Sequence, residues 1–417
     1  MAESSGTYVV VVVGAGLAGA KGVEALREHG FGGRIVLLGA EEHRPYERPP
    51  LSKDYLMGKA EREKAFVHPQ GWYAEHDIDF RPRMEVTAID RSAHEVVTSG
   101  GDRLVYDKLL LATGATPRRL PVPGADHAAV AYLRSIDNSE RIKAALQPDA
   151  RIAIIGGGWI GLEVAAAART AGAQVTVLEG AALPLLRVLG PEVATVFADL
   201  HRAHGVDLRT EISVTGIETG DDGAPVVRLG DGDGIPADLV VVGVGIAPNT
   251  ALAEEAGLKV DNGVVVDEHL RSSDPDIFAA GDVANAYHPV LRRQLRVEHW
   301  ANALHQPDVA ARSMLGQDAS YERLPYFFTD QYDLGMEYFG HADPDDYDEV
   351  ILRGDVPGLA FAAFWLRSGH VLAGLHVNQW DDADAVKKLA RDQREVDVSR
   401  LRDVAVPLAE LAEGDPS

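Results

Sequence analysis

Two glycine clusters are the parts of this chain whose residue types and spacing could do chemistry. The first reads G-A-G-L-A-G at 14–19 and the second reads G-G-G-W-I-G at 156–161. In the G-x-G-x-x-G pattern, the first glycine permits a tight turn, the second lets backbone approach a pyrophosphate, and the third lets a helix pack on a strand. The same three glycines recur 142 positions later, so the sequence predicts two sites for dinucleotide phosphates.

Each cluster lies between a strand-like run and a helix-like segment, which is the context that gives the pattern meaning. Residues 8–13 are a tyrosine and five valines, and residues 151–155 read R-I-A-I-I. Apolar, β-branched runs of this length are typical of strands buried on both faces. We expect helices over 20–29 and 162–171, whose N-terminal N–H groups and dipole would favour a bound pyrophosphate.

A carboxylate at the end of the second strand of such a unit commonly holds the ribose of the adenosine half. In the second unit, strand 174–178 ends on Glu179, which stands 21 residues beyond Gly158. In the first unit Ala40 follows the strand, and Glu41 is the candidate, although a solvated turn residue would read the same. No cation follows Glu179 before Arg187, so we expect NADH rather than NADPH.

Composition excludes several classes of function. The chain has 40 basic and 64 acidic residues and a formal net charge of −24, which argues against nucleic acid or an anionic membrane as the main partner. The first apolar run is only as long as a strand and lacks a basic leader, so we expect no signal peptide, no membrane span and a cytoplasmic protein. With no cysteine, the chain has no redox-active dithiol.

The sequence predicts no metal site. Residues 231–234 read D-G-D-G, but the remaining ligands of a calcium loop are missing, so we interpret them as a hairpin turn. His201 and His204 have helical spacing without a third ligand, and we interpret both as surface residues of a helix.

The remaining pattern predicts an α/β fold with two Rossmann-like dinucleotide-binding domains and a C-terminal α+β domain built on an antiparallel β-meander. Glycine and proline breaks at 114–117 and 245–248 would end the first and second domains. A strand ending in Asp282 and a helix over 301–315 would return the chain to the first domain. The meander strands are expected at 334–340, 349–353, 359–367 and 370–377, followed by helical residues 383–394.

With these residues placed, the chain resembles the NADH-dependent ferredoxin reductases, which are FAD flavoproteins related to glutathione reductase. The resemblance extends from residue 8 to about 401. It also includes apoptosis-inducing factor, a relative on the same fold. The motifs that carry it are R-P-P-L-S-K at 48–53, A-T-G at 112–114, G-G-G-W-I-G-L-E at 156–163, F-A-A-G-D at 278–282 and V-E-H-W-A-N-A at 297–303.

The resemblance implies FAD at the first cluster, in a discontinuous domain of 1–115 and 246–322, and NADH at the second, within 116–245, with 323–417 as the C-terminal domain. The residues it assigns to FAD are Gly14, Gly16, Ala18, Gly19, Glu41, Arg48, Lys53, Val86, Arg134, Asp282, His299 and Trp300. Those it assigns to NAD are Gly156, Gly158, Trp159, Ile160, Gly161, Glu163, Glu179 and Gly245.

The same resemblance gives some of these residues roles. Lys53 would lie by the flavin and pair with Glu163, as electrostatic partners rather than members of an acid/base triad. Asp282 would accept the ribityl hydroxyls, and the helix that starts at His299 and Trp300 would offer backbone N–H groups to the pyrimidine edge of the flavin. Trp159 would be the gate between nicotinamide and flavin. The chain departs from the family at Ala40, where an acid is common, and at Phe328, where relatives carry Trp.

The implied activity is hydride transfer from NADH to FAD, followed by single-electron transfer to a ferredoxin, of 2Fe–2S or similar type, that feeds an oxygenase such as a cytochrome P450. Ferredoxins are acidic, so docking should use a basic spot, for which Arg292, Arg293 and Arg296 are candidates unless they only solvate a hairpin. Two alternatives stay open: reduction of a small acceptor such as a quinone or monodehydroascorbate, and a redox-regulated interaction protein like apoptosis-inducing factor. The sequence leaves monomer or homodimer undecided.

Overall fold

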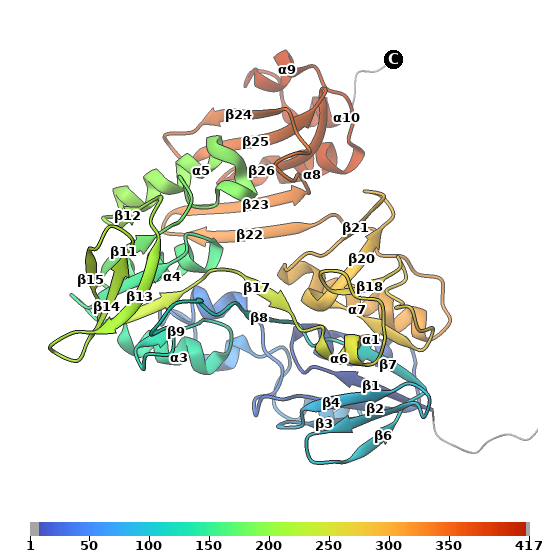
Figure 1. Ribbon diagram of the computed structural model, residues 1–417. Coiled ribbons are helices and arrows are strands. Elements are labelled where there is room, and N and C mark those ends of the chain that lie inside the picture. The colour runs from blue at the N-terminus through green and yellow to red at the C-terminus, as the bar shows by residue number, and fades with distance from the viewer. Residues whose placement is uncertain (1–7, 414–417) are drawn as a thin grey trace, which may run out of the picture. The chain divides into compact units, whose positions relative to one another are not determined.

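The computed structural model describes residues 8–413, which form two units (Figure 1). The first unit contains the described residues up to Arg48, Glu61–Thr116 and Ile246–Arg323. The second contains Pro49–Ala60, Pro117–Gly245 and the described residues from Leu324 on. Each unit is therefore assembled from segments that are distant in sequence.

A parallel sheet of five strands forms the core of the first unit, in the order β19-β7-β1-β2-β3. Its strands are β1 (Val9–Val13), β2 (Arg34–Leu38), β3 (Ile78–Arg81), β7 (Lys108–Leu111) and β19 (Ile277–Ala279). The valines of β1 are almost fully buried, as the apolar run predicts for a strand covered on both faces.

Helix α1 (Leu17–Glu28) follows β1 and packs against α7 (Trp300–Met314) within this unit. It begins three residues earlier than the predicted Ala20, because Gly16 is the N-cap and the third glycine lies in the first turn. The α7 helix agrees with the predicted 301–315 to within one residue at each end. Both helices are amphipathic, and their buried faces are rich in small residues.

Two small sheets complete the first unit. One is antiparallel and contains β4 (Val86–Asp90), β5 (Glu95–Thr98) and β6 (Arg103–Val105). The other contains β18 (Val264–Val266), β20 (Ala284–His288) and β21 (Arg293–Leu295). Pro82 has no N–H to donate, and the chain leaves the large sheet after β3 before it pairs again in β4. Shorter elements are η2 (Arg62–Ala65), α2 (Trp72–Glu75), β8 (Ala115–Pro117), β17 (Ile246–Pro248), α6 (Ala251–Glu255) and η3 (Gly281–Val283).

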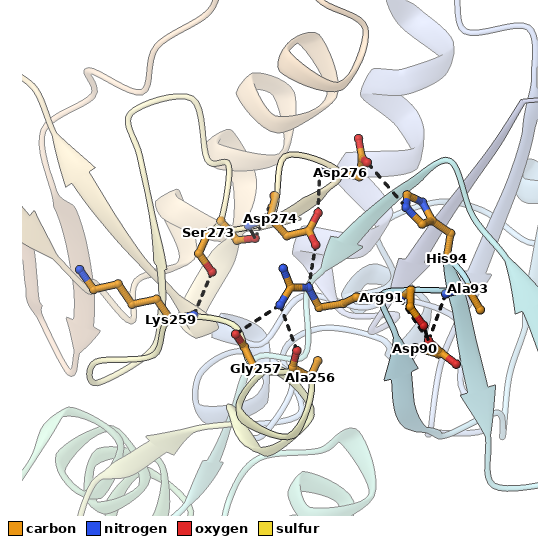
Figure 2. A network of polar contacts seen from close by, with 12 residues as sticks. Asp90, Arg91, Ala93, His94, Ala256, Gly257, Lys259, Ser273, Asp274 and Asp276 are labelled. Carbon is orange, nitrogen blue, oxygen red and sulfur yellow. Dashed lines mark hydrogen bonds and ion pairs between the residues drawn. The ribbon is translucent and has the colours of Figure 1, made fainter.

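Arg91 joins the early and late segments of the first unit, as Figure 2 shows. Its Nε donates to the Asp274 carboxylate at 2.7 Å, and one terminal nitrogen reaches the carbonyls of Ala256 and Gly257 at 3.3 and 3.4 Å. One guanidinium thus bonds two separate turns of the returning segment, which fixes that segment beside the β4–β5 turn.

The second unit repeats the parallel sheet, in the order β12-β11-β10-β16-β9. Its strands are β9 (Val130–Ala131), β10 (Arg151–Ile155), β11 (Gln174–Leu178), β12 (Asp207–Arg209) and β16 (Leu239–Val242). The bounds of β10 and β11 match the sequence prediction. The helices are α3 (Ile136–Ala145), α4 (Trp159–Thr170) and α5 (Leu186–Ala203), and a small antiparallel sheet contains β13 (Val214–Thr219), β14 (Pro225–Leu229) and β15 (Gly234–Pro236). Residues 231–234 lie at the β14–β15 hairpin, which confirms the predicted turn.

The second unit also contains the C-terminal antiparallel sheet, in the order β22-β23-β26-β25-β24. Its strands are β22 (Tyr326–Gln331), β23 (Leu334–Gly340), β24 (Glu349–Asp355), β25 (Ala360–Arg367) and β26 (His370–Val377). The order departs from a plain meander, because β23 pairs with β26 rather than with β24. Helices α8 (Ala383–Asp392), α9 (Val398–Arg402) and α10 (Leu408–Glu413) follow, and the 3-10 turns are η1 (Pro49–Ser52) and η4 (Trp380–Asp382). The β22 strand lies within the predicted domain 323–417 but precedes the four strands that were predicted for it.

Candidate functional site

The first glycine loop has the backbone that the pattern predicts. Gly14 has φ +111°, and a Cβ there would overlap the carbonyl oxygen of Ala112. A Cβ at Gly19 would overlap the carbonyl oxygen of Gly14 itself. The folded chain itself therefore requires glycine at both positions.

The second loop reproduces this arrangement. Gly156 has φ +103°, and a Cβ there would overlap the carbonyl oxygen of Gly243. A Cβ at Gly161 would overlap the oxygen of Gly156. The β-strand, the turn and the helix thus meet in the same way in both units.

The second glycine of each G-x-G-x-x-G pattern differs from the first and the third, because the folded chain leaves room for a side chain there. Gly16 and Gly158 have ordinary negative φ angles and form the N-caps of α1 and α4. A Cβ at Gly16 would meet nothing within 4 Å, and one at Gly158 would come no closer than 3.9 Å to the oxygen of Gly243. Open space above two helix N-termini is what a pyrophosphate needs, so both loops fit a dinucleotide.

Glu179 lies directly beside the second loop. Its carboxylate accepts the backbone N–H of Gly157 at 2.6 Å and that of Ala181 at 2.7 Å. The two bonds fix the carboxylate against the glycine backbone and leave lone pairs for two ribose hydroxyls. The contact of Glu179 with a ribose stays a prediction.

Glu41, the corresponding candidate in the first unit, is held by side chains instead. The hydroxyl of Tyr46 donates to its carboxylate at 2.5 Å, and a guanidinium nitrogen of Arg48 lies 3.7 Å from its other oxygen. The side chain of Glu41 is 42% exposed. The structure therefore joins two of the predicted FAD residues, Glu41 and Arg48, in one small cluster.

Most of the other predicted FAD residues in the first unit stand at element ends. Ala18 is buried in the first turn of α1 and packs near Gly281, so it adjoins the η3 turn that contains Asp282. His299 is the N-cap of α7, and the indole of Trp300 donates to Glu47 at 3.0 Å. Separately, Val86 is the half-buried first residue of β4.

Two predicted cofactor residues lie in the second unit away from the glycine loop. Arg134 precedes α3, and its backbone N–H donates to the side chain of Asn138 in the cap of that helix. Gly245 has φ +98°, and its carbonyl accepts the N–H of Arg118 at 2.9 Å.

Trp159 begins α4 and packs against two aromatic rings of the second unit. Its ring centroid is 5.6 Å from that of Phe197 on α5 and 4.4 Å from that of Phe327 on β22. The next residue, Ile160, is 41% exposed. The ring of Trp159 is thus fixed by packing, whereas Ile160 faces solvent at the start of the helix.

Lys53 and Glu163 form the ion pair that the resemblance implies. The ammonium of Lys53 lies 2.6 Å from Oε1 of Glu163, which is 3% exposed on the second turn of α4. Ser52 donates to Oε2 at 2.5 Å, and Thr329 on β22 donates to Oε1 at 2.7 Å. Three donors therefore converge on one buried carboxylate, and Lys53 also lies 5.3 Å from the ring centroid of Phe328.

His201 is fully buried, so our interpretation of it as a surface residue was wrong. Its Nε2 bonds Oε1 of Gln331 at 2.8 Å, and burial lowers its pKa to about 4. The sequence held a signal for this. Leu189, Val193, Phe197 and His201 follow one another at intervals of four, and all four are buried on one face of α5. His204 instead stacks on Tyr332 at 3.7 Å between centroids.

The three arginines proposed for docking have different surroundings. Arg292 is exposed in the β20–β21 turn, and Arg293 begins β21. Arg296 is only 8% exposed, pairs with Glu298 at 2.5 Å and reaches the carbonyl of Asp282 at 3.4 Å. The side chain of Arg296 is therefore bonded within its own loop.

Within residues 8–413 no group of three or more metal-binding side chains occurs. In the same range, every helix is too short or too polar to cross a membrane.

Comparison with known proteins identifies the family. Residues 8–306 match the pyridine nucleotide-disulphide oxidoreductase family. The chain belongs to that family. Residues 326–412 match the reductase C-terminal family, which corresponds to the antiparallel sheet and its helices.

Full-length relatives are ferredoxin reductases by name. The chain is 42% identical to putidaredoxin reductase of Pseudomonas putida over 96% of each chain. It is 40% identical to the ferredoxin–NAD(+) reductase component of the anthranilate 1,2-dioxygenase system of Burkholderia cepacia, over 95% of this chain and 98% of that one. A solved covalent complex of putidaredoxin reductase with putidaredoxin contains a chain that matches with a TM-score of 0.94 and 40% identity, over 97% of this chain and 98% of that one.

Family membership settles the class of protein. The chain is an oxidoreductase and a flavoprotein, its cofactors are FAD and NADH, and its fold is the mixed α/β fold with a C-terminal antiparallel sheet that the sequence predicted.

Proposed function

We propose that this protein takes electrons from NADH and passes them singly, through FAD, to a 2Fe–2S or similar ferredoxin that feeds an oxygenase such as a cytochrome P450. The observation that carries the proposal is the full-length match to reductases named for such systems, including the one solved in complex with putidaredoxin. The absence of cysteine agrees with it, because this chain has no dithiol to receive electrons from the flavin.

We assign FAD to the first unit and NADH to the second, with the C-terminal sheet as a further domain. The assignment of NADH rests on Glu179, whose carboxylate is fixed beside the open space at Gly158 and would accept both ribose hydroxyls. The 2′-phosphate of NADPH would lie beside that carboxylate, and the two negative groups would repel each other, so the site should disfavour NADPH.

The residues of this protein would bind and orient the two cofactors. The bound FAD would supply the chemistry, because a flavin can accept two electrons together and release them one at a time. Gly16 and Gly158 leave room for the two pyrophosphates, and the helix N-termini offer N–H groups to them. We propose that the ammonium of Lys53, held by Glu163, faces the flavin, and that Trp159 limits access of the nicotinamide.

A ferredoxin would dock at the exposed β20–β21 turn, where Arg292 and Arg293 offer positive charge on a protein of net charge −24. Arg296 would support the turn from within. A cytoplasmic location, where NADH is available as the donor, is part of this proposal.

The first test is anaerobic rapid mixing of the holoprotein with one equivalent of NADH, followed by a panel of oxidised ferredoxins. Fast bleaching of the flavin band and reoxidation by one ferredoxin would support the proposal and identify the partner. Reoxidation by a quinone or monodehydroascorbate alone would favour a small-molecule reductase. Slow bleaching into a stable long-wavelength band that no acceptor relieves would favour an interaction protein.

The docking surface has its own test. Arg292→Glu with Arg293→Glu should reduce kcat/KM for the ferredoxin about tenfold or more at low salt and leave ferricyanide reduction unchanged. Arg292→Glu alone and Arg83→Glu form the charge-matched comparison, because Arg83 is also an exposed arginine of the first unit. An equal loss in Arg83→Glu would place the effect in net charge rather than in docking.

A further inference from the structure

A chain of buried hydrogen bonds leads from His201 to the Lys53–Glu163 pair. Nε2 of His201 lies 2.8 Å from Oε1 of Gln331, and Nε2 of Gln331 lies 3.1 Å from the hydroxyl of Thr329. That hydroxyl lies 2.7 Å from Oε1 of Glu163. Gln331, Thr329 and His201 are each no more than 1% exposed, so water cannot substitute for any of the three.

The direction of every bond in this chain follows from the charge of Glu163. A carboxylate only accepts, so Thr329 must use its single proton on Glu163 and can only accept from Gln331. The amide of Gln331 then directs its NH₂ at Thr329 and its oxygen at His201. His201 must therefore carry its proton on Nε2. If Glu163 were protonated toward Thr329, the chain could run in the opposite sense.

The hydrogen-bond chain begins at the charged Glu163 and ends at an uncharged group, His201. Nδ1 of His201 faces the hydroxyl of Tyr332 at 3.4 Å, and burial keeps the imidazole neutral by lowering its pKa. The neighbouring carboxyl of Asp330 interacts electrostatically with both Lys53 and Glu163, and its pKa is raised, first by burial. All donors of the chain point toward Glu163, and aligned hydrogen bonds of this kind strengthen one another.

We propose that Thr329, Gln331 and His201 are positioning residues for Lys53: they form a one-way hydrogen-bond chain that keeps Glu163 ionised and so keeps the proton on Lys53. The alternative state transfers a proton from Nζ of Lys53 to Oε1 of Glu163 and leaves both groups neutral. Removing a hydrogen-bonding group from this hydrogen-bond chain favours that proton transfer, because the carboxylate of Glu163 then loses a donor or is bonded less strongly. The effect on electron transfer rests on the proposed function, through the placement of Lys53 beside the flavin.

The direct test is the tautomer of His201 in the wild-type holoprotein. Long-range proton–nitrogen correlation spectra of protein with ¹⁵N-labelled histidine distinguish Nε2–H from Nδ1–H, and the His201→Gln variant identifies the signal. We expect the neutral Nε2–H form from pH 5 to 8. A predominant Nδ1–H form, or titration near the ordinary histidine pKa of about 6.5, would overturn the proposal.

The second test measures the effect on the cofactor without turnover. Thr329→Val keeps the shape of the side chain and removes the donor, so the carboxylate of Glu163 loses one of its three donors and proton transfer from Lys53 becomes more favourable. With less positive charge at Lys53, the midpoint potential of the bound flavin should become more negative, and Thr329→Ser should restore it. Thr98→Val, at a buried threonine of the first unit, is the matched control.

An unchanged potential in Thr329→Val, or equal shifts in Thr329→Val and Thr98→Val, would also overturn the proposal. Its failure is separable from that of the proposed function. The tautomer of His201 and the midpoint potential of the flavin are both measured without ferredoxin. A protein that reduces no ferredoxin can therefore still have this hydrogen-bond chain, and a ferredoxin reductase can lack the hydrogen-bond chain.

Discussion

The two dinucleotide units of this protein have similar glycine loops and parallel sheets, but the helices that follow the two loops carry different residues at the same position. In the second unit, Glu163 on α4 is buried beneath Lys53 and Thr329. The residue 142 positions earlier is Lys21 on α1, which is 26% exposed and pairs with Glu24 in the next turn. A buried carboxylate in one unit thus corresponds to a surface cation in the other.

The difference follows from what each helix packs against. Helix α1 packs on α7, whose facing residues are mostly small, and the side chain of Lys21 stays at the surface. Helix α4 packs on β22 and on η1, which bring Thr329, Ser52 and Lys53 to it. The glycine loop therefore determines where a dinucleotide can bind, whereas the packing partners of the helix determine which charges surround it.

The largest effect is expected from the third glycine of each loop. Gly19→Ala and Gly161→Ala should each cost about 3 kcal/mol or more, because the new Cβ would overlap a backbone oxygen that cannot move independently. Urea unfolding and the soluble yield would measure this. Gly16→Ala and Gly158→Ala are the controls, since they should fold normally and lose only their dinucleotide. Normal stability of Gly161→Ala would show that the two loops are not equivalent.

His201 should make stability depend on pH in a way that has no counterpart on α1. Its folded pKa of about 4 lies below the unfolded value near 6.5, so the unfolded state binds more protons between these values. Stability should therefore fall by about 3 kcal/mol as the pH drops from 6.5 to 4. His201→Gln should remove this part of the slope in urea unfolding curves measured across that range. Parallel curves for the variant and the wild type would contradict the prediction.

The two strand-end carboxylates should differ in their effect on binding. Glu179→Gln should raise the KM for NADH about tenfold, since it disturbs two backbone bonds and the expected ribose contacts. The Glu179→Gln variant should also show a smaller preference for NADH over NADPH than the wild type. Glu41→Gln should weaken FAD binding less, because Glu41 is partly exposed and screened by solvent. Isothermal titration of each cofactor would compare them, and a larger loss for Glu41→Gln would reverse the ranking.

The smallest effect is expected at Lys21. Lys21→Ala removes a surface pair in the next turn of α1 and should change stability by no more than about 0.5 kcal/mol. Thermal unfolding would measure it beside Glu163→Ala, which leaves the ammonium of Lys53 without its buried partner. Similar losses of stability in Lys21→Ala and Glu163→Ala would mean that burial of the ion pair does not make it contribute more to stability.

The sequence was sufficient for the loops and for the strands that carry them, because glycine spacing and apolar runs are local signals. The ends of β10 and β11 and the glycine backbones agree with prediction, and Glu179 lies at the end of β11 as the sequence indicates. The partners of Glu163 beyond Lys53 were not predicted. Thr329 and Gln331 lie more than 160 residues further along the chain, and neither has an unusual sequence context.

Other misses have physical reasons as well. His201 was misread because two histidines at helical spacing were interpreted by residue type, whereas the interval of four from Leu189 marks the buried face. The edge strand β9 was missed because it has only two residues, too few for an alternation to be visible. The helix starts were placed late because the N-cap is a glycine with no capping side chain.

The chain passes between the two units five times, at residues 48, 60, 116, 245 and 323, and this has a consequence for synthesis on the ribosome. Strand β7 ends at Leu111, but its outer neighbour β19 begins only at Ile277. At ordinary elongation rates of about 5 to 20 residues per second, the apolar edge of β7 waits on the order of ten seconds or more for its partner. An unpaired apolar strand edge is a template for aggregation. The nascent chain should therefore depend on chaperones more than a protein of the same size whose units fold one after the other.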